Sequence, residues 1–213
     1  MSGKSDTLDS LRSSRLVAVL RKIPREVAAP LCRALAAGGV NCVEVTMDTA
    51  GALQIIETLS TLPNLTVGAG TVLDPEGAAA AIRAGARFIV SPCLNVEVIK
   101  LCNRWGVVVI PGTLSPTEIL SAAEAGADLV KVFPASIMGA RYFREIRGPL
   151  SHINLMASGG ISAENAAEYL AAGVDILAVG SSLVDLQLVA ERRWDEVRAR
   201  ATRFRRIVEG LGA

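Results

Sequence analysis

The eleven residues from Glu124 to Pro134 read EAGADLVKVFP, and this stretch contains the pattern that decides the fold. Its first residues end an alanine-rich run that favours a helix, its glycine suits the left-handed conformation that closes a helix, and its β-branched residues favour a strand. The same order recurs as AAGGVNCVEV from Ala36, RAGARFIVSP from Arg83 and AAGVDILAVG from Ala171. Because the strand portions are apolar almost throughout, they indicate a parallel sheet covered by helices.

Working outward from these four joints, we expect eight short strands, each followed by a helix. Their starts lie 19 to 26 residues apart, which is the length of one strand-helix unit. Eight units in about 200 residues match a small (β/α)₈ barrel, an α/β fold of TIM type, whereas a doubly wound sheet usually has about five to seven strands. We predict a single barrel domain over residues 1–213, a short helix before Leu16, a last helix over Glu191–Gly210, and strands at Leu16–Leu20, Cys42–Thr46, Thr66–Gly70, Phe88–Ser91, Val107–Pro111, Leu129–Phe133, Ile153–Ala157 and Ile176–Val179.

Composition narrows the range of partners. The chain has 213 residues, of which 51% are apolar and 20% charged, and its formal net charge is +1. Such a chain has no overall field to attract nucleic acid or an anionic membrane surface. Its longest uncharged stretches are 16 residues long and are broken by Pro, Asn and Gly, so neither suits a membrane span. We therefore expect a small-molecule partner, with no nucleic acid and no membrane.

The cysteines and the N-terminus indicate the compartment. The opening residues MSGKSDTLDS lack the apolar core of a signal peptide, and the four cysteines form no CxxC pair. The one histidine, His152, is too few for the usual zinc clusters. We predict a cytoplasmic protein with reduced thiols, no metal and no cofactor.

Lys131 is the first candidate for chemistry. It interrupts the apolar strand LVKVFP, in a chain with only four lysines. In a barrel of this type the reactive groups come from the carboxyl ends of the strands. Burial lowers the pKa of a lysine, and a neutral amine attacks a carbonyl to form a Schiff base. The alternative is a structural lysine that pairs with a carboxylate in the barrel mouth.

Glu44, in CVEVT, is equally out of place between valines. It occupies the late position in the second strand that Lys131 has in the sixth, so both side chains are expected to point inward at the same height. A Schiff-base enzyme needs a group that moves protons, and a partly desolvated glutamate suits that task. The alternative is that Glu44 only neutralises Lys131.

Two glycine-serine segments follow the last two strands. SGGIS begins at Ser158, and VGSS begins at Val179. Glycines let backbone N–H groups approach an anion, and many barrels bind phosphate after strands seven and eight. We predict a phosphate site there, with Ser162 as the N-cap of the next helix and Ser181 as a hydroxyl donor. The alternative is a pair of plain tight turns.

These residues together resemble the 2-dehydro-3-deoxy-phosphogluconate aldolase family, the KDPG/KHG aldolases. The resemblance spans about Leu16 to Val184 and is carried by EVTMDT from Glu44, GAGTVLDPE from Gly68, SPCL from Ser91, IPGTLSPTE from Ile110, KVFPAS from Lys131, SGGIS from Ser158 and VGSSLV from Val179. It implies a class I, metal-free aldolase that needs no cofactor and is a homotrimer. The expected reaction cleaves a 2-keto-3-deoxy-6-phospho sugar acid to pyruvate and glyceraldehyde 3-phosphate.

The resemblance also implies roles for individual residues. Lys131 is expected to form the Schiff base, and Glu44 to act as the acid/base. Thr71 is expected to contact the carboxylate of the pyruvyl part, while Pro92 and Phe133 shape an apolar wall around the imine. The phosphate is expected to bind at Gly159, Gly160, Gly180 and Ser181.

One departure from the family pattern concerns the substrate carboxylate. Better-known members have an arginine where this chain has Asp48, and a carboxylate cannot bind another anion. Arg21, at the end of the first strand, is the expected replacement, because a guanidinium binds a carboxylate with two parallel hydrogen bonds. This arginine resembles the galactonate branch of the family, whereas the hydroxyl of Ser158 resembles the gluconate branch. The preferred epimer stays open, and Asp48 is an alternative partner for a substrate hydroxyl.

Three other functions fit parts of the pattern. An aldolase for non-phosphorylated 4-hydroxy-2-oxoglutarate-type acids would leave the glycine loops without a ligand. An isomerase or epimerase would use paired acids or histidine-bound metal, and the single His152 argues against the metal-dependent kind. A non-catalytic barrel that binds a sugar phosphate would bind its ligand without Lys131.

Overall fold

The strands form one parallel sheet that curls into a barrel. The structure, a computed structural model, describes residues 3–210. The order of neighbouring strands is β5-β4-β3-β2-β1-β9-β8-β7-β6. The strands are β1 (Leu16–Leu20), β2 (Cys42–Thr46), β3 (Thr66–Gly70), β4 (Phe88–Val90), β5 (Val108–Ile110), β6 (Gly112–Thr113), β7 (Val130–Val132), β8 (Leu155–Ser158) and β9 (Ile176–Val179).

Pro111 divides one strand of the barrel into β5 and β6. Proline has no N–H to donate to a neighbouring strand. Its carbonyl still accepts a hydrogen bond from the Lys131 N–H, 2.9 Å away. β5 pairs with β4 and β6 pairs with β7, so the chain through Pro111 continues the ring. The architecture is that of a TIM-type barrel with eight strand positions, as the sequence pattern predicts.

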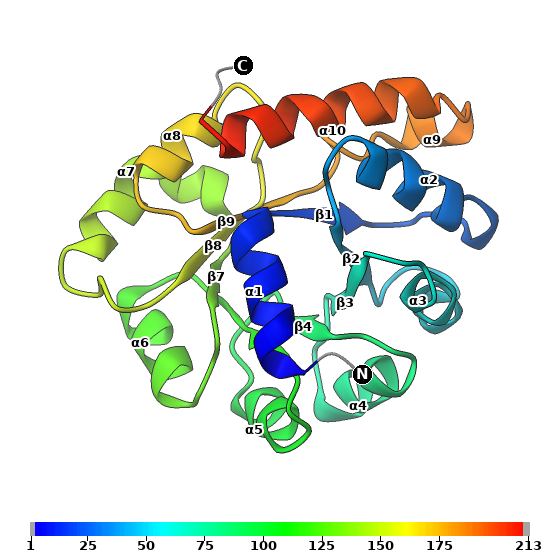
Figure 1. Ribbon diagram of the computed structural model, residues 1–213. Coiled ribbons are helices and arrows are strands. Elements are labelled where there is room, and N and C mark those ends of the chain that lie inside the picture. The colour runs from blue at the N-terminus through cyan, green and yellow to red at the C-terminus, as the bar shows by residue number, and fades with distance from the viewer. Residues whose placement is uncertain (1–2, 211–213) are drawn as a thin grey trace.

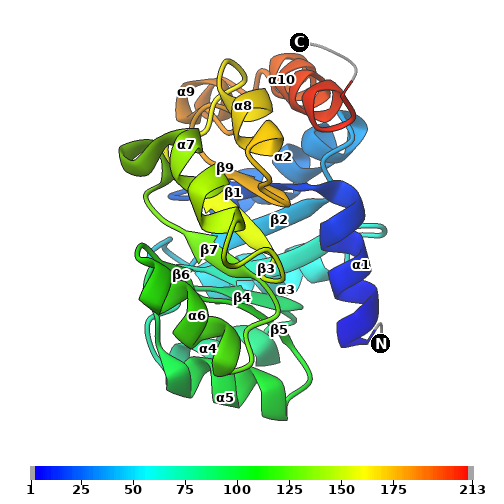
Figure 2. The same cartoon turned by 90° about the vertical axis from the view of Figure 1, so that its left-hand side faces the viewer.

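Helices surround the barrel on its outside (Figure 1). α1 lies across the amino ends of β1, β2, β5 and β9, where Leu11 is fully buried (Figures 1 and 2). The helices are α1 (Lys4–Ser14), α2 (Arg25–Ala37), α3 (Ala52–Ser60), α4 (Pro75–Arg83), α5 (Val96–Arg104), α6 (Pro116–Glu124), α7 (Ala135–Arg147), α8 (Ala166–Ala171), α9 (Leu186–Ala190) and α10 (Trp194–Val208). Within residues 3–210, no helix combines the length and apolar character needed to cross a membrane.

Two apolar clusters account for the continuous burial of the strands. One fills the barrel and includes Phe88, Ile110 and Met156, and the other lies between the barrel and its helices. Phe88 fits inside because Gly68 on the next strand has no side chain, and a Cβ there would lie 2.4 Å from the ring. Burying each large apolar side chain stabilises the fold by about 1.5–3 kcal/mol. The interior of the barrel is therefore filled with packed apolar side chains.

Four of the eight strands have the predicted bounds, and the other four and the last helix differ. The expected strand Phe88–Ser91 ends at Val90, and Leu129–Phe133 is shortened to Val130–Val132. The expected strand Val107–Pro111 is interrupted by its own proline and resumes at Gly112. The seventh strand begins at Leu155 instead of Ile153, because the Ile153 carbonyl accepts a hydrogen bond from Arg147 (2.8 Å) outside the sheet. The last helix is shorter than Glu191–Gly210, because α9 ends before it and α10 begins at Trp194.

Candidate active site

A cavity of about 360 Å³ opens at the carboxyl ends of the strands. This volume lies within the range of small-molecule sites. All eleven residues singled out from the sequence line it: Arg21, Glu44, Thr71, Pro92, Lys131, Phe133, Ser158, Gly159, Gly160, Gly180 and Ser181. The structure thus brings together residues that are spread over 161 positions of the chain.

Lys131 lies on β7 with a side chain that is only 6% exposed. Burial lowers the pKa of its amine; the negative charge of Glu44 works against that shift and the positive charge of Arg21 adds to it. Its Nζ lies 5.0 Å from the centre of the Phe133 ring. Among residues 3–210, no carboxylate oxygen lies within 4.0 Å of Nζ, so no direct ion pair holds the proton on the amine.

Glu44 lies on β2 and is 1% exposed. Burial raises the pKa of its carboxyl, and the positive charges of Lys131 and Arg21 oppose that shift. Its Oε2 is buried and has no hydrogen-bond partner within the described part of the chain. Leaving a buried oxygen unsatisfied costs about 1–3 kcal/mol, so this atom is arranged for a partner from outside the protein.

Arg21 links the loops that follow the first three strands. Its Nη1 forms an ion pair with Oδ2 of Asp48 at 2.6 Å, and its Nη2 donates to the Thr71 hydroxyl at 3.0 Å. Burial raises the pKa of Asp48, but a hydrogen bond to Thr46 and the charge of Arg21 together outweigh it and leave the pKa below its usual value. Asp48 therefore stays ionised beside Arg21 at neutral pH.

Thr71 has an unusual backbone conformation, with φ at +57°. A β-branched residue rarely adopts a left-handed conformation, and such strain typically costs about 1–3 kcal/mol and is concentrated at functional sites. The conformation places Thr71 at the cavity and its hydroxyl next to Arg21. Its location therefore agrees with a role in binding.

Pro92, Phe133 and Ser158 form the less polar part of the cavity wall. Ser158 is 5% exposed, whereas Phe133 keeps 36% of its surface exposed at the mouth. Pro92 approaches β6 so closely that a Cβ on Gly112 would lie 2.3 Å from its carbonyl carbon. The glycine therefore permits the chain after β4 to reach the cavity.

The glycine-serine loops after β8 and β9 expose backbone donors. Gly159 and Gly160 have φ values of +91° and +75°, which other residues rarely adopt. Within residues 3–210, the N–H groups of Gly159, Gly160, Gly180 and Ser181 donate to no protein acceptor. Unused N–H groups that line one cavity can bind an anion.

Two side chains fix these loops in place. The Ser182 hydroxyl donates to the Ile161 carbonyl at 2.6 Å and so joins the two loops. Asn165 donates from Nδ2 to the Gly160 carbonyl at 2.9 Å and accepts from the Ser162 N–H at 2.8 Å. The prediction that Ser162 caps the following helix is wrong, because α8 begins only at Ala166 and Asn165 occupies its N-cap position.

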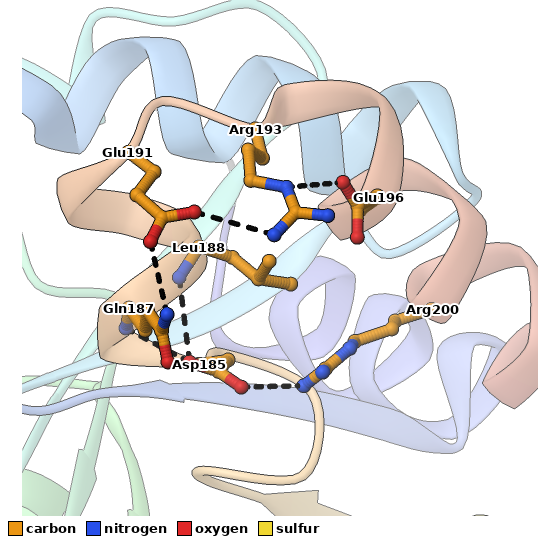
Figure 3. A network of polar contacts seen from close by, with 7 residues as sticks. All are labelled: Asp185, Gln187, Leu188, Glu191, Arg193, Glu196 and Arg200. Atoms are coloured by element: carbon orange, nitrogen blue, oxygen red, sulfur yellow. Dashed lines mark hydrogen bonds and ion pairs between the residues drawn. The ribbon is translucent and has the colours of Figure 1, made fainter.

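A polar network secures the helices behind the last loop. Asp185 caps α9 by accepting from the N–H groups of Gln187 and Leu188, and it forms an ion pair with Arg200 of α10 at 3.2 Å (Figure 3). Arg193 bridges Glu191 and Glu196 in the same figure. These contacts tie α9 and α10 together directly after the loop that carries Ser181.

Five further residues line the cavity: Val19, Ile161, Ser162, Ala178 and Ser182. Ile161, Ser162 and Ser182 belong to the two glycine-serine segments predicted to bind phosphate, whereas Val19 and Ala178 were not predicted. Val19 and Ala178 lie two positions before Arg21 and Gly180, so the alternation of side chains along a strand could have identified them. The interaction of Ser182 with Ile161 crosses from one loop to another, and no local spacing in the sequence indicates it.

A larger cavity, about 850 Å³, lies near α1 at the opposite end of the barrel. Its lining includes Cys42, and burial raises the pKa of that thiol to about 11, so it stays protonated. Arg205 at its rim is already paired with Glu209 at 2.6 Å. Cavity volume alone would therefore favour the amino end of the barrel as the functional site. The perturbed pKa values of Lys131 and Glu44 favour the smaller cavity at the carboxyl end.

No group of three or more His, Cys, Asp or Glu side chains is arranged for a metal ion anywhere in residues 3–210. The candidates for chemistry in the cavity are the amine of Lys131 and the carboxyl of Glu44. The pKa of the amine is lowered and that of the carboxyl is raised. Such an amine can add to a ketone, and such a carboxyl can donate the proton with which water leaves the adduct.

Comparison with known proteins agrees with this geometry. The family model described as KDPG and KHG aldolase matches residues 8–200. The chain is accordingly an aldolase, a lyase that acts on carbon–carbon bonds. It belongs to the KDPG and KHG aldolase family, as the resemblance predicted.

Individual relatives cover nearly the whole chain. A 2-dehydro-3-deoxy-phosphogluconate aldolase of Treponema pallidum (strain Nichols) is 37% identical over 94% of this chain and 96% of the relative. A 2-dehydro-3-deoxy-6-phosphogalactonate aldolase of Escherichia coli (strain K12) is 33% identical over 91% of this chain and 96% of the relative. The crystal structure of a KDPG aldolase from Legionella pneumophila, with pyruvate captured as a covalent carbinolamine, is 30% identical, with a TM-score of 0.86 over 92% of this chain and 96% of that one.

Proposed function

We propose that Lys131 forms a Schiff base with a 2-keto-3-deoxy-6-phospho sugar acid, which the protein cleaves to pyruvate and glyceraldehyde 3-phosphate. The observation that carries this proposal is the position of Lys131, a buried amine with a lowered pKa, in one cavity with the unpartnered carboxyl of Glu44. The reaction needs an electron sink, because expelling a carbanion from an unactivated ketone is far too slow.

The reaction begins when the neutral amine of Lys131 adds to the C2 carbonyl. Glu44, directly or through a water, donates the proton with which the carbinolamine hydroxyl leaves as water, and a protonated imine forms. The Glu44 carboxylate then takes the proton of the C4 hydroxyl as the C3–C4 bond breaks, and the electron pair moves into the imine as an enamine. Protonation of the enamine at C3 and hydrolysis of the imine release pyruvate and restore the amine.

The remaining cavity residues orient the substrate. Arg21 and Thr71 hold the C1 carboxylate, and the apolar faces of Pro92 and Phe133 surround the imine. Ser158 donates its hydroxyl to the sugar chain. The phosphate occupies the unused N–H groups of Gly159, Gly160, Gly180 and Ser181, which lie in the same 360 Å³ cavity.

Borohydride reduction tests the covalent step. Wild-type protein incubated with pyruvate and borohydride is expected to gain the mass of a reduced pyruvyl adduct, and peptide mapping is expected to place it on Lys131. The Lys131→Met variant serves as the control and should gain no mass. An adduct on another residue, or active enzyme that is never labelled, would refute the proposal.

A second candidate is cleavage of non-phosphorylated 4-hydroxy-2-oxoglutarate-type acids. The family description names both KDPG and KHG aldolases, so family membership supports either substrate. The free N–H groups of the glycine loops favour the phosphorylated one. Turnover measured with both acids, and with the gluconate and galactonate epimers, decides among them. A non-catalytic sugar-phosphate binder would instead be stabilised by its ligand without turnover, and Lys131→Met would bind equally well.

We also propose that residues 1–213 form one domain that assembles as a homotrimer in the cytoplasm and acts in carbohydrate metabolism. Support for assembly comes from large apolar side chains exposed beside the carboxyl ends of the strands, among them Leu73, Leu114 and Ile137, the last of which is 76% exposed. Support for a reducing compartment comes from the cysteines, all four of which are free thiols. Sedimentation of the purified protein tests the trimer.

A further inference from the structure

Gly70, the last residue of β3, lies against the carboxyl group of Glu44. A Cβ at this glycine would lie 2.6 Å from Oε1 and 2.9 Å from Cδ of Glu44. The Cβ atoms of real side chains do not lie so close to other heavy atoms. An alanine at position 70 would therefore clash with Glu44 in its present position. Gly70 does not adopt a left-handed φ, and its backbone conformation therefore does not require glycine.

The strand register shows which way Glu44 leans. Glu44 pairs with Gly68, and Thr46 pairs with Gly70. The carboxyl group therefore lies over a residue two positions further along β3, a diagonal neighbour toward the carboxyl end of the barrel. That direction leads to the cavity, whose lining includes Glu44 and Thr71.

The two glycines of β3 make room for different groups. The space beside Gly68 is filled by the ring of Phe88, and the space beside Gly70 by Glu44. Glycine inside a strand is unfavourable and often marks a place where another group approaches closely. Because Glu44 Oε2 has no hydrogen-bond partner among residues 3–210, packing rather than hydrogen bonding sets the position of the carboxyl group.

We infer that Gly70 is a positioning residue for Glu44, because its missing side chain is the space in which the acid/base carboxyl lies. This inference rests on the proposed role of Glu44. Gly70 itself touches no reacting atom, and its effect is exerted through the carboxyl group. A displacement of about 1 Å in a reacting group can cost about 10²-fold in rate.

A double-mutant cycle with Gly70→Ala and Glu44→Ala tests the inference. The readouts are kcat and KM for cleavage, the exchange of the C3 protons of pyruvate with deuterated solvent, and the denaturant midpoint. Gly70→Ala is expected to lower kcat and the exchange rate by about 10²-fold with little change in KM, and to lower the midpoint. In the Glu44→Ala background the same change should affect neither the remaining exchange rate nor the midpoint, because the space is then empty.

Gly68→Ala provides the matched control. Its Cβ meets the ring of Phe88, so its stability cost should persist in the Glu44→Ala background. If Gly70→Ala does not fold, folding of the double variant supports the inference, and failure of the double variant overturns it. Wild-type kcat in Gly70→Ala, or an equal loss in both backgrounds, also overturns it. Full exchange activity in Glu44→Ala would instead refute the proposed role of Glu44, so the two failures are distinguishable.

Discussion

Arg21 and Asp48 form an ion pair of 2.6 Å at the rim of the cavity. The pair joins the loop after β1 to the loop after β2, and the bond from Arg21 to Thr71 extends the connection to the loop after β3. The family resemblance implies a substrate-binding arginine at the position of Asp48. In this chain the cation in the cavity is Arg21, which follows the neighbouring strand β1. Asp48 forms an ion pair with Arg21 and does not itself bind the substrate carboxylate.

The first prediction concerns the substrate carboxylate. Replacing Arg21 with alanine removes a charge-assisted hydrogen bond of about 1.5–3 kcal/mol, so KM for the keto acid should rise by roughly 10- to 150-fold. Arg21→Lys keeps the charge but lacks the planar guanidinium fork, so its KM should lie between those of the wild type and Arg21→Ala. Steady-state kinetics at fixed pH measure both values. An unchanged KM in Arg21→Ala would assign the carboxylate to another group.

The second prediction concerns the pH dependence of imine formation, measured as the rate of borohydride trapping at saturating pyruvate. Only the neutral amine reacts, so the rate rises with pH through the pKa of Lys131. Glu44 raises that pKa and Arg21 lowers it. Glu44→Gln should therefore move the rising limb to lower pH, and Arg21→Gln should move it to higher pH. Shifts in the same direction would contradict the charge arrangement.

The third prediction concerns the phosphate loops. Ser182→Ala removes the bond between the loops, worth about 0.5–1.5 kcal/mol, and should lower kcat/KM for the phosphorylated acid by roughly 2- to 12-fold. The value for a non-phosphorylated keto acid should not change. Ser10→Ala is the matched control, because that hydroxyl donates to the Asp6 carbonyl at 2.8 Å in α1, at the other end of the barrel. Equal losses with both substrates would show that Ser182 acts on the whole fold.

The fourth prediction concerns stability. Lys131 and Glu44 are buried without a direct ion pair, so replacing both by an apolar residue of similar volume in Lys131→Met/Glu44→Met should raise the free energy of unfolding by about 1–4 kcal/mol while abolishing activity. The pKa of Glu44 is raised on folding, so its ionisation is destabilising above the ordinary glutamate pKa; Lys131, with a lowered pKa, is destabilising below the ordinary lysine pKa. The gain should hence be larger at pH 7 than at pH 4, where only the lysine contributes. Urea unfolding at the two pH values measures it, and a destabilised double variant would contradict it.

The fold was largely predictable because its signals are local. A glycine that ends a helix and a β-branched run that follows it lie within one stretch, and the bounds of β1, β2, β3 and β9 agree with the sequence pattern. The break at Pro111 was less visible, because it depends on which backbone groups of β4 and β7 face the proline. Strand ends such as Leu155 depend on competition between sheet hydrogen bonds and a side chain, here Arg147.

The candidate site was predictable wherever a residue conflicts with its surroundings. Lys131 and Glu44 stand out because charged groups rarely interrupt apolar strands. The pairing of Arg21 with Asp48 did not stand out, since 27 positions separate the two and either alone looks like a surface residue. The role of Gly70 depends on an empty space, which only the packing of β2 against β3 reveals.

The ring of strands has one further consequence, for the order in which the protein is made. β1 pairs on one side with β2 and on the other with β9, where Val17 is opposite Ala178. During synthesis the first strand therefore has an open apolar edge until residues near 179 have left the ribosome, and such edges favour aggregation. The loops that expose the N–H groups of Gly160 and Ser181 form at that same late stage. When β9 pairs with β1, the nascent chain therefore forms its anion site and covers its aggregation-prone edge at the same time.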